Sequence, residues 1–130
     1  MQEPFLGAKV RIGRAHELLD SLKDAGKAYW ESHPYVQLRE PNPDGLTDTF
    51  KFRLTKPVPG VFDLLVVEAV EHMRASLDYI GYEAAALGGV AEPKSSYFPI
   101  ADTAAKLESD VIGRGRCKDL PADILAAFSV

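Results

Sequence analysis

Residues 59–89 read PGVFDLLVVEAVEHMRASLDYIGYEAAALGG and predict one helix of about 27 residues. Pro59 stands near the start, where helices tolerate proline, and Gly88-Gly89 supplies the residue type that commonly ends them. At 100° per residue, a set of apolar side chains shares one face, which we expect to be the core. The set is Val66, Ala69, Val70, Met73, Leu77, Ile80 and Ala84.

The opposite face of this predicted helix carries the residues best suited to chemistry. Glu68 and His72 are four residues apart, so the carboxylate could orient the imidazole, and Tyr79 lies on the same side. The candidate catalytic residues are Glu68, His72, Arg74 and Tyr79. In this hypothesis Glu68 and His72 handle protons, Arg74 holds an anionic group and Tyr79 donates a hydrogen bond. The alternative is a helix seam of a bundle or dimer, in which Glu68 satisfies His72.

Two further charged clusters have a plainer explanation beside a functional one. The triplet Glu71, Arg74 and Asp78 has the spacing of ion pairs along a helix surface, although arginine also suits carboxylate or phosphate recognition. The run 113–118 contains Arg114, Arg116 and Lys118, which is typical of a solvated loop and could also bind an anion.

Two elements are predicted before this helix. Residues 5–30 repeat apolar or small side chains at spacings of three and four, which indicates a long amphipathic helix, and Pro34 ends it. Tyr35–Glu40 and Thr47–Thr55 then alternate with a period of two around the turn residues 41–45, as in an antiparallel β-hairpin. We expect one apolar hairpin face, with Lys51 and Arg53 on the exposed side. The apolar residues are Val36, Leu38, Phe50, Phe52 and Leu54.

The remaining residues are predicted to close the core. Tyr97-Phe98-Pro99-Ile100 is expected to plug it, Asp102 could cap a short helix over Thr103 to Ile112, and Pro121 to Phe128 is expected to form a last helix. The expected fold class is therefore α+β. Two long antiparallel helices carry a β-hairpin inserted between them, and two short C-terminal helices follow, in a single domain over residues 1–130.

The second long helix and the loop after it resemble a family of uncharacterised bacterial proteins. The second helix of that family carries a His-x-x-Arg-Ser-x-Leu-Asp signature, and a loop with Phe-Pro-Ile follows. In the same order this chain has His72, Arg74, Leu77, Asp78 and Phe98-Pro99-Ile100. It departs from the signature in having Ala75 in place of Ser, and one residue instead of two between His72 and Arg74. The start of the first helix, residues 9–15, is similar as well. The resemblance implies this fold over most of the chain and implies no activity.

Other motifs are sparse. Arg11 and His16 match the Arg-x4-His element of HEPN-type ribonucleases by spacing, but the residue after that arginine is usually polar and here it is Ile12. The nucleotide-binding, phosphate-loop, metalloprotease and hydrolase motifs that carry Gly-x-Gly-x-x-Gly, Gly-Lys-Ser/Thr, His-Glu-x-x-His and Gly-x-Ser-x-Gly are missing from the sequence. We therefore expect no cofactor and no metal.

Charge and cysteine content restrict the partners and the compartment. Fifteen Lys and Arg against nineteen Asp and Glu give a net charge of −4, which argues against a nucleic-acid partner. Cys117 has no second cysteine in the chain, which suits a reducing cytosol. The start of the chain lacks a signal-peptide pattern, and no apolar run reaches about 18 residues. A cytoplasmic protein without a membrane partner is expected.

The balance of apolar surface gives the leading functional hypothesis. The long helices carry more apolar and aromatic surface than one hairpin and two short helices can cover, which favours a self-associating module, as a homodimer. The second hypothesis is a small-molecule enzyme, or a binder of a small anionic ligand, that uses the four candidate residues. RNA binding or cleavage through Arg11 and His16 is the third.

Overall fold

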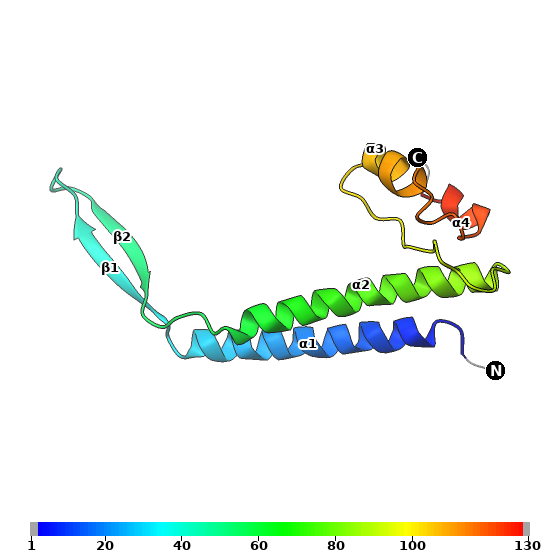
Figure 1. The fold of residues 1–130 in the computed structure, drawn as a ribbon. Coiled ribbons are helices and arrows are strands. Elements are labelled where there is room, and N and C mark those ends of the chain that lie inside the picture. Colours follow the sequence, from blue (N-terminus) through cyan, green and yellow to red (C-terminus); the bar gives the residue numbers. More distant parts are fainter. Residues whose placement is uncertain (1–2, 129–130) are drawn as a thin grey trace. The chain divides into compact units, whose positions relative to one another are not determined.

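A computed structural model describes residues 3–128 of the chain, which fall into two compact units: Met1–Ala15 with Val70–Val130, and His16–Ala69. The elements are α1 (Leu6–Glu31), β1 (Tyr35–Pro41), β2 (Asp48–Leu54), α2 (Val61–Leu87), α3 (Ala104–Lys106), the π-helix η1 (Leu107–Ile112) and α4 (Ala122–Ala126) (Figure 1). The α+β class is confirmed, with the hairpin inserted between the two long helices. Within residues 3–128, every helix is too short or too polar to cross a membrane.

The unit His16–Ala69 joins the end of α1, the hairpin and the start of α2. The ring of Tyr29 meets Phe62 edge-on at 5.9 Å between centroids, and the Tyr29 hydroxyl donates to the carbonyl of Lys56 at 2.9 Å. His33 adopts a left-handed backbone, with φ of 51°, just before the buried Pro34. This conformation turns the chain out of α1 and into β1.

The register of the hairpin corrects the prediction of a single apolar face. Tyr35 pairs with Leu54 and Gln37 with Phe52, whereas Leu38 pairs with Lys51. Directly opposite residues share a face of the sheet. One face therefore carries Tyr35, Gln37, Arg39, Pro41, Asp48, Phe50, Phe52 and Leu54, and the other carries Val36, Leu38, Glu40, Thr49, Lys51 and Arg53. We call the first the aromatic face. The loop of residues 42–47 fixes this register and could not be placed from periodicity alone.

In the other unit, the first turns of α1 lie against the second half of α2 through small side chains. Ala8 is buried, and the buried Ser76 hydroxyl donates to the Ala8 carbonyl at 3.1 Å. A Cβ on Gly7 would lie 2.8 Å from the ring of Tyr79, so only glycine fits there without a shift of that ring. The backbone amide of Phe5, just before α1, donates to the Glu83 carboxylate.

The predicted core stripe of α2 is wrong in part. Val66 is 44% exposed and Val70 is 52% exposed, while Ala69 and Ala84 are buried as expected. Met73, Leu77 and Ile80 are only half-buried. Small residues (alanine, serine and glycine) form the seam between the helices, which leaves the longer side chains of the stripe outside it. The main buried cluster instead lies nearer the C-terminus, and its members are Ala84, Ala85, Cys117 and Leu120, with Val111, Ile112, Ile124 and Leu125 packed against them.

The C-terminal elements differ from the prediction in detail. Thr103, rather than Asp102, caps α3, because its hydroxyl accepts from the Lys106 amide at 3.2 Å, while Asp102 pairs with the Lys106 ammonium. The chain then widens into η1, and α4 is shorter than the expected last helix. Of the predicted plug, Pro99 is buried and Phe98 packs edge-on against Phe128, but Tyr97 and Ile100 are exposed.

Candidate functional site

His72 is held by an arginine from the first helix. Nη1 of Arg11 lies 3.2 Å from Nδ1 of His72, and both residues are half-buried. A guanidinium has only donors, so Nδ1 of His72 is the acceptor in this hydrogen bond. The Arg11 guanidinium carbon also lies 5.9 Å from the centre of the Tyr79 ring, within cation–π range. Arg11 therefore unites two of the four predicted residues, His72 and Tyr79.

The other two predicted residues, Glu68 and Arg74, take no part in this contact with Arg11. Glu68 is half-buried one turn before His72 and belongs to the unit His16–Ala69, and among residues 3–128 its carboxylate has no hydrogen-bond or ion-pair partner. Arg74 is two residues beyond His72, which turns it about 200° around α2. The predicted site is thus divided between two flanks of the helix. Arg74 can therefore act only together with residues on its own flank of α2, and not with His72.

The Arg-x4-His spacing does not bring its two members to one place on α1. Arg11 is half-buried against His72, whereas His16 is exposed and lies five residues further along the helix, a rotation of about 140°.

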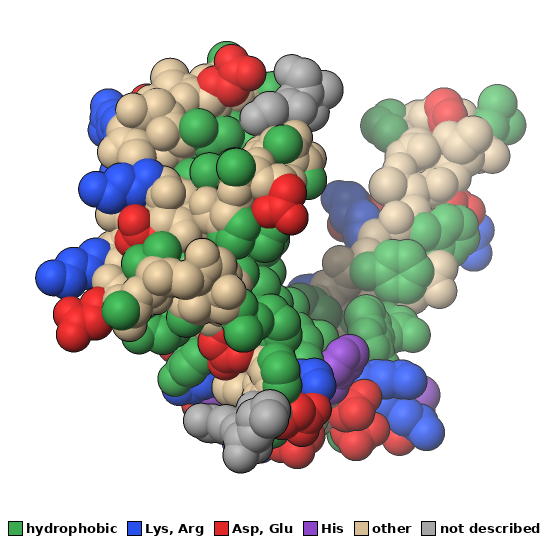
Figure 2. All heavy atoms as spheres, turned by 90° about the vertical axis from the view of Figure 1, so that its right-hand side faces the viewer, with side chains coloured by type: hydrophobic (Ala, Val, Ile, Leu, Met, Phe, Trp, Pro, Cys, Tyr) green, Lys and Arg blue, Asp and Glu red, His purple; other side chains and the backbone are tan. Residues whose placement is uncertain are grey.

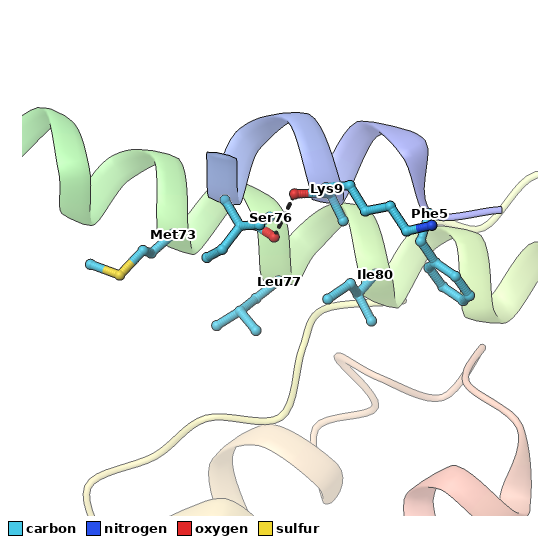
Figure 3. A pocket seen from close by; sticks show the side chains of 8 residues that line it. Phe5, Lys9, Met73, Ser76, Leu77 and Ile80 are labelled. Carbon is cyan, nitrogen blue, oxygen red and sulfur yellow. Dashed lines mark hydrogen bonds between the residues drawn. The ribbon is translucent and has the colours of Figure 1, made fainter. Parts of the chain in front are cut away.

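Two grooves run along α2 in the unit that contains its second half. The α1–α2 groove has a volume of about 590 Å³, and Figure 3 shows Met73, Leu77 and Ile80 projecting to the same side of α2. Its lining is Phe5, Ala8, Lys9, Ile12, Met73, Ser76, Leu77 and Ile80. Lys9 is the one charged residue of that lining, and it forms an ion pair with Glu3. This groove is an apolar surface with little chemistry to offer.

The second groove carries free charges. It measures about 450 Å³ and is lined by Val70, Met73, Arg74, Leu77, Asp78, Tyr97, Phe98, Ile100, Val111 and Arg116. We call it the arginine groove, because two guanidinium groups from separate segments line it. No ion pair joins Glu71, Arg74 and Asp78 in residues 3–128, although their spacing on α2 would allow one. A smaller pocket of about 230 Å³ shares Asp78 and Tyr97 with this groove.

One wall of the arginine groove is fixed by backbone hydrogen bonds. The Asp119 carboxylate accepts from the amides of Ser95 and Lys94 at 2.8 and 2.9 Å, and these bonds lower the pKa of Asp119. The amide of Tyr97 donates to the Arg116 carbonyl at 3.2 Å. The loop of residues 94–97 is therefore held by hydrogen bonds to the segment that carries Arg116.

Gly81 allows this loop to approach α2. A Cβ at Gly81 would lie 2.1 Å from the Ser96 carbonyl oxygen, a separation that no side chain can occupy. In the sequence, Gly81 stands inside a strongly helical stretch, and a glycine in such a place can indicate that another backbone segment approaches closely. The placement of Arg116 had no such signal, because its distance along the chain from Arg74 says nothing about their proximity.

Cys117 belongs to the core and not to a reactive site. It is 1% exposed, and burial raises the pKa of its thiol, so the nucleophilic thiolate is disfavoured. Within residues 3–128, no three histidine, cysteine, aspartate or glutamate side chains are grouped so that they could hold a metal ion.

No protein-family model matches the chain, and no curated protein or solved structure is significantly similar to it. Its function has to be inferred from its own side chains.

Proposed function

We propose that this protein is a self-associating module and that the aromatic face of its hairpin binds the same face of a second copy. The observation that carries the proposal is the exposure of three adjacent apolar side chains: Phe50 at 57%, Phe52 at 69% and Leu54 at 57%. Figure 2 shows hydrophobic side chains, in green, at the surface of the hairpin. An isolated two-stranded sheet is marginal in water, and a partner sheet would stabilise it.

The rings of this face pack against one another and against Trp30 of α1. Trp30 meets Tyr35 at 5.6 Å and Tyr35 meets Phe52 at 5.8 Å between centroids, both edge to face. Aromatic side chains fixed by one another lose little conformational freedom on association, so more of the burial energy contributes to affinity. Aromatic clusters of this kind are common among the residues that dominate binding between proteins.

The charges of the aromatic face suit a second copy. Its charged residues are Arg39 and Asp48, and Nε of Arg39 donates to the Asp48 carboxylate at 2.8 Å. The face is therefore neutral, so two copies can approach without net repulsion. In a twofold arrangement an apolar centre would be flanked by exposed ion pairs, which is the usual anatomy of an interface. The opposite face has an excess of positive charge from Arg53, because Lys51 pairs with Glu40.

Membership of the bacterial family with the Phe-Pro-Ile loop is part of the same proposal and adds no activity to it.

Sedimentation equilibrium on the full chain and on two matched lysine variants tests the proposal. Gln37→Lys adds a positive charge at the partner position of Phe52 on the aromatic face, and Thr49→Lys adds the same charge on the opposite face. We expect the parent chain to dimerise at micromolar concentration. Gln37→Lys should raise the dissociation constant at least tenfold, and Thr49→Lys should leave it within about threefold.

Two results would overturn the proposal. A strict monomer at high micromolar concentration would exclude self-association, and equal weakening by both variants would exclude the aromatic face as its site. Circular dichroism of each variant shows whether the hairpin persists, and both changes leave every ring of the aromatic face in place.

A further inference from the structure

We infer that the arginine groove binds a small amphipathic monocarboxylate, of the kind represented by a medium-chain fatty acid, with its head group between Arg74 and Arg116. This ligand site lies in the unit Met1–Ala15 with Val70–Val130 and is independent of the hairpin.

The charge of the groove fits one negative group. Arg74 and Arg116 have no ion-pair partner among residues 3–128, whereas the neighbouring Arg114 pairs with Asp110 at 3.7 Å. Asp78 lines the same groove and is likewise unpaired in that range, so the three side chains sum to one positive charge. A monoanion neutralises that charge, while a phosphate or dicarboxylate would leave a surplus of negative charge. Arginine is also the side chain that best matches the planar carboxylate.

The rest of the groove fits an alkyl chain. Apart from its three charged residues and the ring of Tyr97, the lining is wholly apolar: Val70, Met73, Leu77, Phe98, Ile100 and Val111. Its volume of about 450 Å³ lies in the range of small-molecule sites, which typically join an apolar wall to a few polar groups. Val70, which the sequence placed in the core, is half exposed at this groove.

Hydrogen bonds and a buried side chain hold one wall of the groove in place, which lowers the cost of binding. Asp119 ties residues 94 and 95 to the segment that follows Arg116, and the buried Cys117 anchors that segment in the core. The Arg116 carbonyl accepts a hydrogen bond from the amide of Tyr97, and both residues line the groove. Preformed walls leave little ordering to be done on binding.

Isothermal titration calorimetry of the full chain with decanoate, below its micelle concentration, tests the site. Decanol serves as the neutral partner of equal length, and hexanoate as the shorter acid. We expect decanoate to bind with a one-to-one stoichiometry per chain and decanol to bind at least tenfold more weakly. Hexanoate should be weaker than decanoate by up to about fourfold for each methylene removed.

Three arginine variants locate the head group. Arg74→Gln and Arg116→Gln should each weaken decanoate binding about 10- to 100-fold, since each removes a charge-assisted hydrogen bond. Arg114→Gln, from the same basic run but paired outside the groove, should leave it within about twofold. All three side chains are exposed, so the fold should persist, and thermal melts check that it does.

The proposal fails if decanoate does not bind at millimolar concentration, if decanol binds as tightly as decanoate, or if Arg114→Gln weakens binding as much as the other two. An affinity that rises only in the presence of lipid vesicles would assign the groove to a membrane surface and would equally overturn it. Each outcome is independent of dimer formation, which Gln37→Lys can remove beforehand.

Discussion

Arg11 donates through Nη1 to Nδ1 of His72 at 3.2 Å, and this bond joins residues 61 positions apart in the chain. This hydrogen bond gives His72 a structural role, as the acceptor for a side chain of α1. Arg11 covers the ring of Tyr79 at the same time, so one guanidinium links α1 to two turns of α2.

Replacing His72 should therefore destabilise the protein through Arg11. His72→Leu leaves a half-buried guanidinium without its acceptor, and we expect a loss of about 1–2 kcal/mol in the free energy of unfolding, measured by urea denaturation. His72→Gln keeps an acceptor oxygen and should recover part of that loss. The exposed His16 provides the control, since His16→Leu should change stability by less than about 0.5 kcal/mol. Equal effects at positions 72 and 16 would contradict this role.

Gly81→Ala should destabilise the protein strongly, although it adds only one methyl group. The added methyl group would lie 2.1 Å from the Ser96 backbone oxygen, so the loop has to move away from α2. We expect a loss of about 1–3 kcal/mol in thermal or urea unfolding. Gly13→Ala is the matched control, because a Cβ there meets nothing within 4 Å and α1 should gain up to about 1 kcal/mol. Two variants of equal stability would show that the loop does not rest on Gly81.

The hairpin loop should weaken in acid. The Thr47 hydroxyl and the amides of Leu46 and Thr47 donate to the Asp44 carboxylate and lower its pKa below 3.8. A depressed folded pKa means that the charged carboxylate stabilises the loop above the unfolded value, and that this stability is lost as the pH falls through the folded value. The protection of the Leu46 and Thr47 amides against hydrogen exchange, relative to an unstructured chain at the same pH and measured by NMR, should fall below about pH 4.

Asp44→Asn supplies the control for this acid effect. The variant lacks the titrating group, so its loop amides should exchange faster at neutral pH and should show no further loosening in acid. If the parent and the variant have the same pH profile, Asp44 is not the group responsible.

Cys117 should react with thiol reagents only when the structure opens. Its side chain is almost wholly covered, and burial raises the pKa of the thiol, so at neutral pH it is both protonated and inaccessible. Modification by a chromogenic disulfide should be at least about 100-fold slower in buffer than in denaturant, because the thiol can react only after the structure around it opens, and opening costs free energy. Rapid labelling of the native chain would show that the cluster around Cys117 opens readily.

The periodicity of the sequence predicted the main elements, and the reason is physical. The spacings of three and four over residues 5–30 and 61–87 reflect helices that each bury one side, and the alternation in residues 35–54 reflects a pleated pair. Helix ends were predicted to within a few residues because Pro34 and Gly88 constrain the backbone locally. The single-domain expectation remains a prediction.

Contacts between distant segments could not be predicted in this way. Nothing local says that Arg11 meets His72, or that Arg116 lines the same groove as Arg74. The hairpin register depends on how residues 42–47 fold as a loop, so Val36 and Leu38 were assigned to the wrong face. The core stripe failed because alanine and serine form the seam; Ala8 and Ala15, seven residues apart and both buried, were the available signal.

The π-helix η1 determines how the residues after it are rotated about the helix axis relative to α3. The amide of Gly113 bonds to the carbonyl of Glu108 five residues earlier at 2.7 Å, and the amide of Arg116 bonds to that of Val111 at 3.1 Å, where an α-helix would reach back four. Such a turn holds one more residue than an ordinary turn. Deleting that residue would rotate everything after it by about 100° relative to α3. The direction in which the Arg116 side chain points therefore depends on the one extra residue in the π-helical turn.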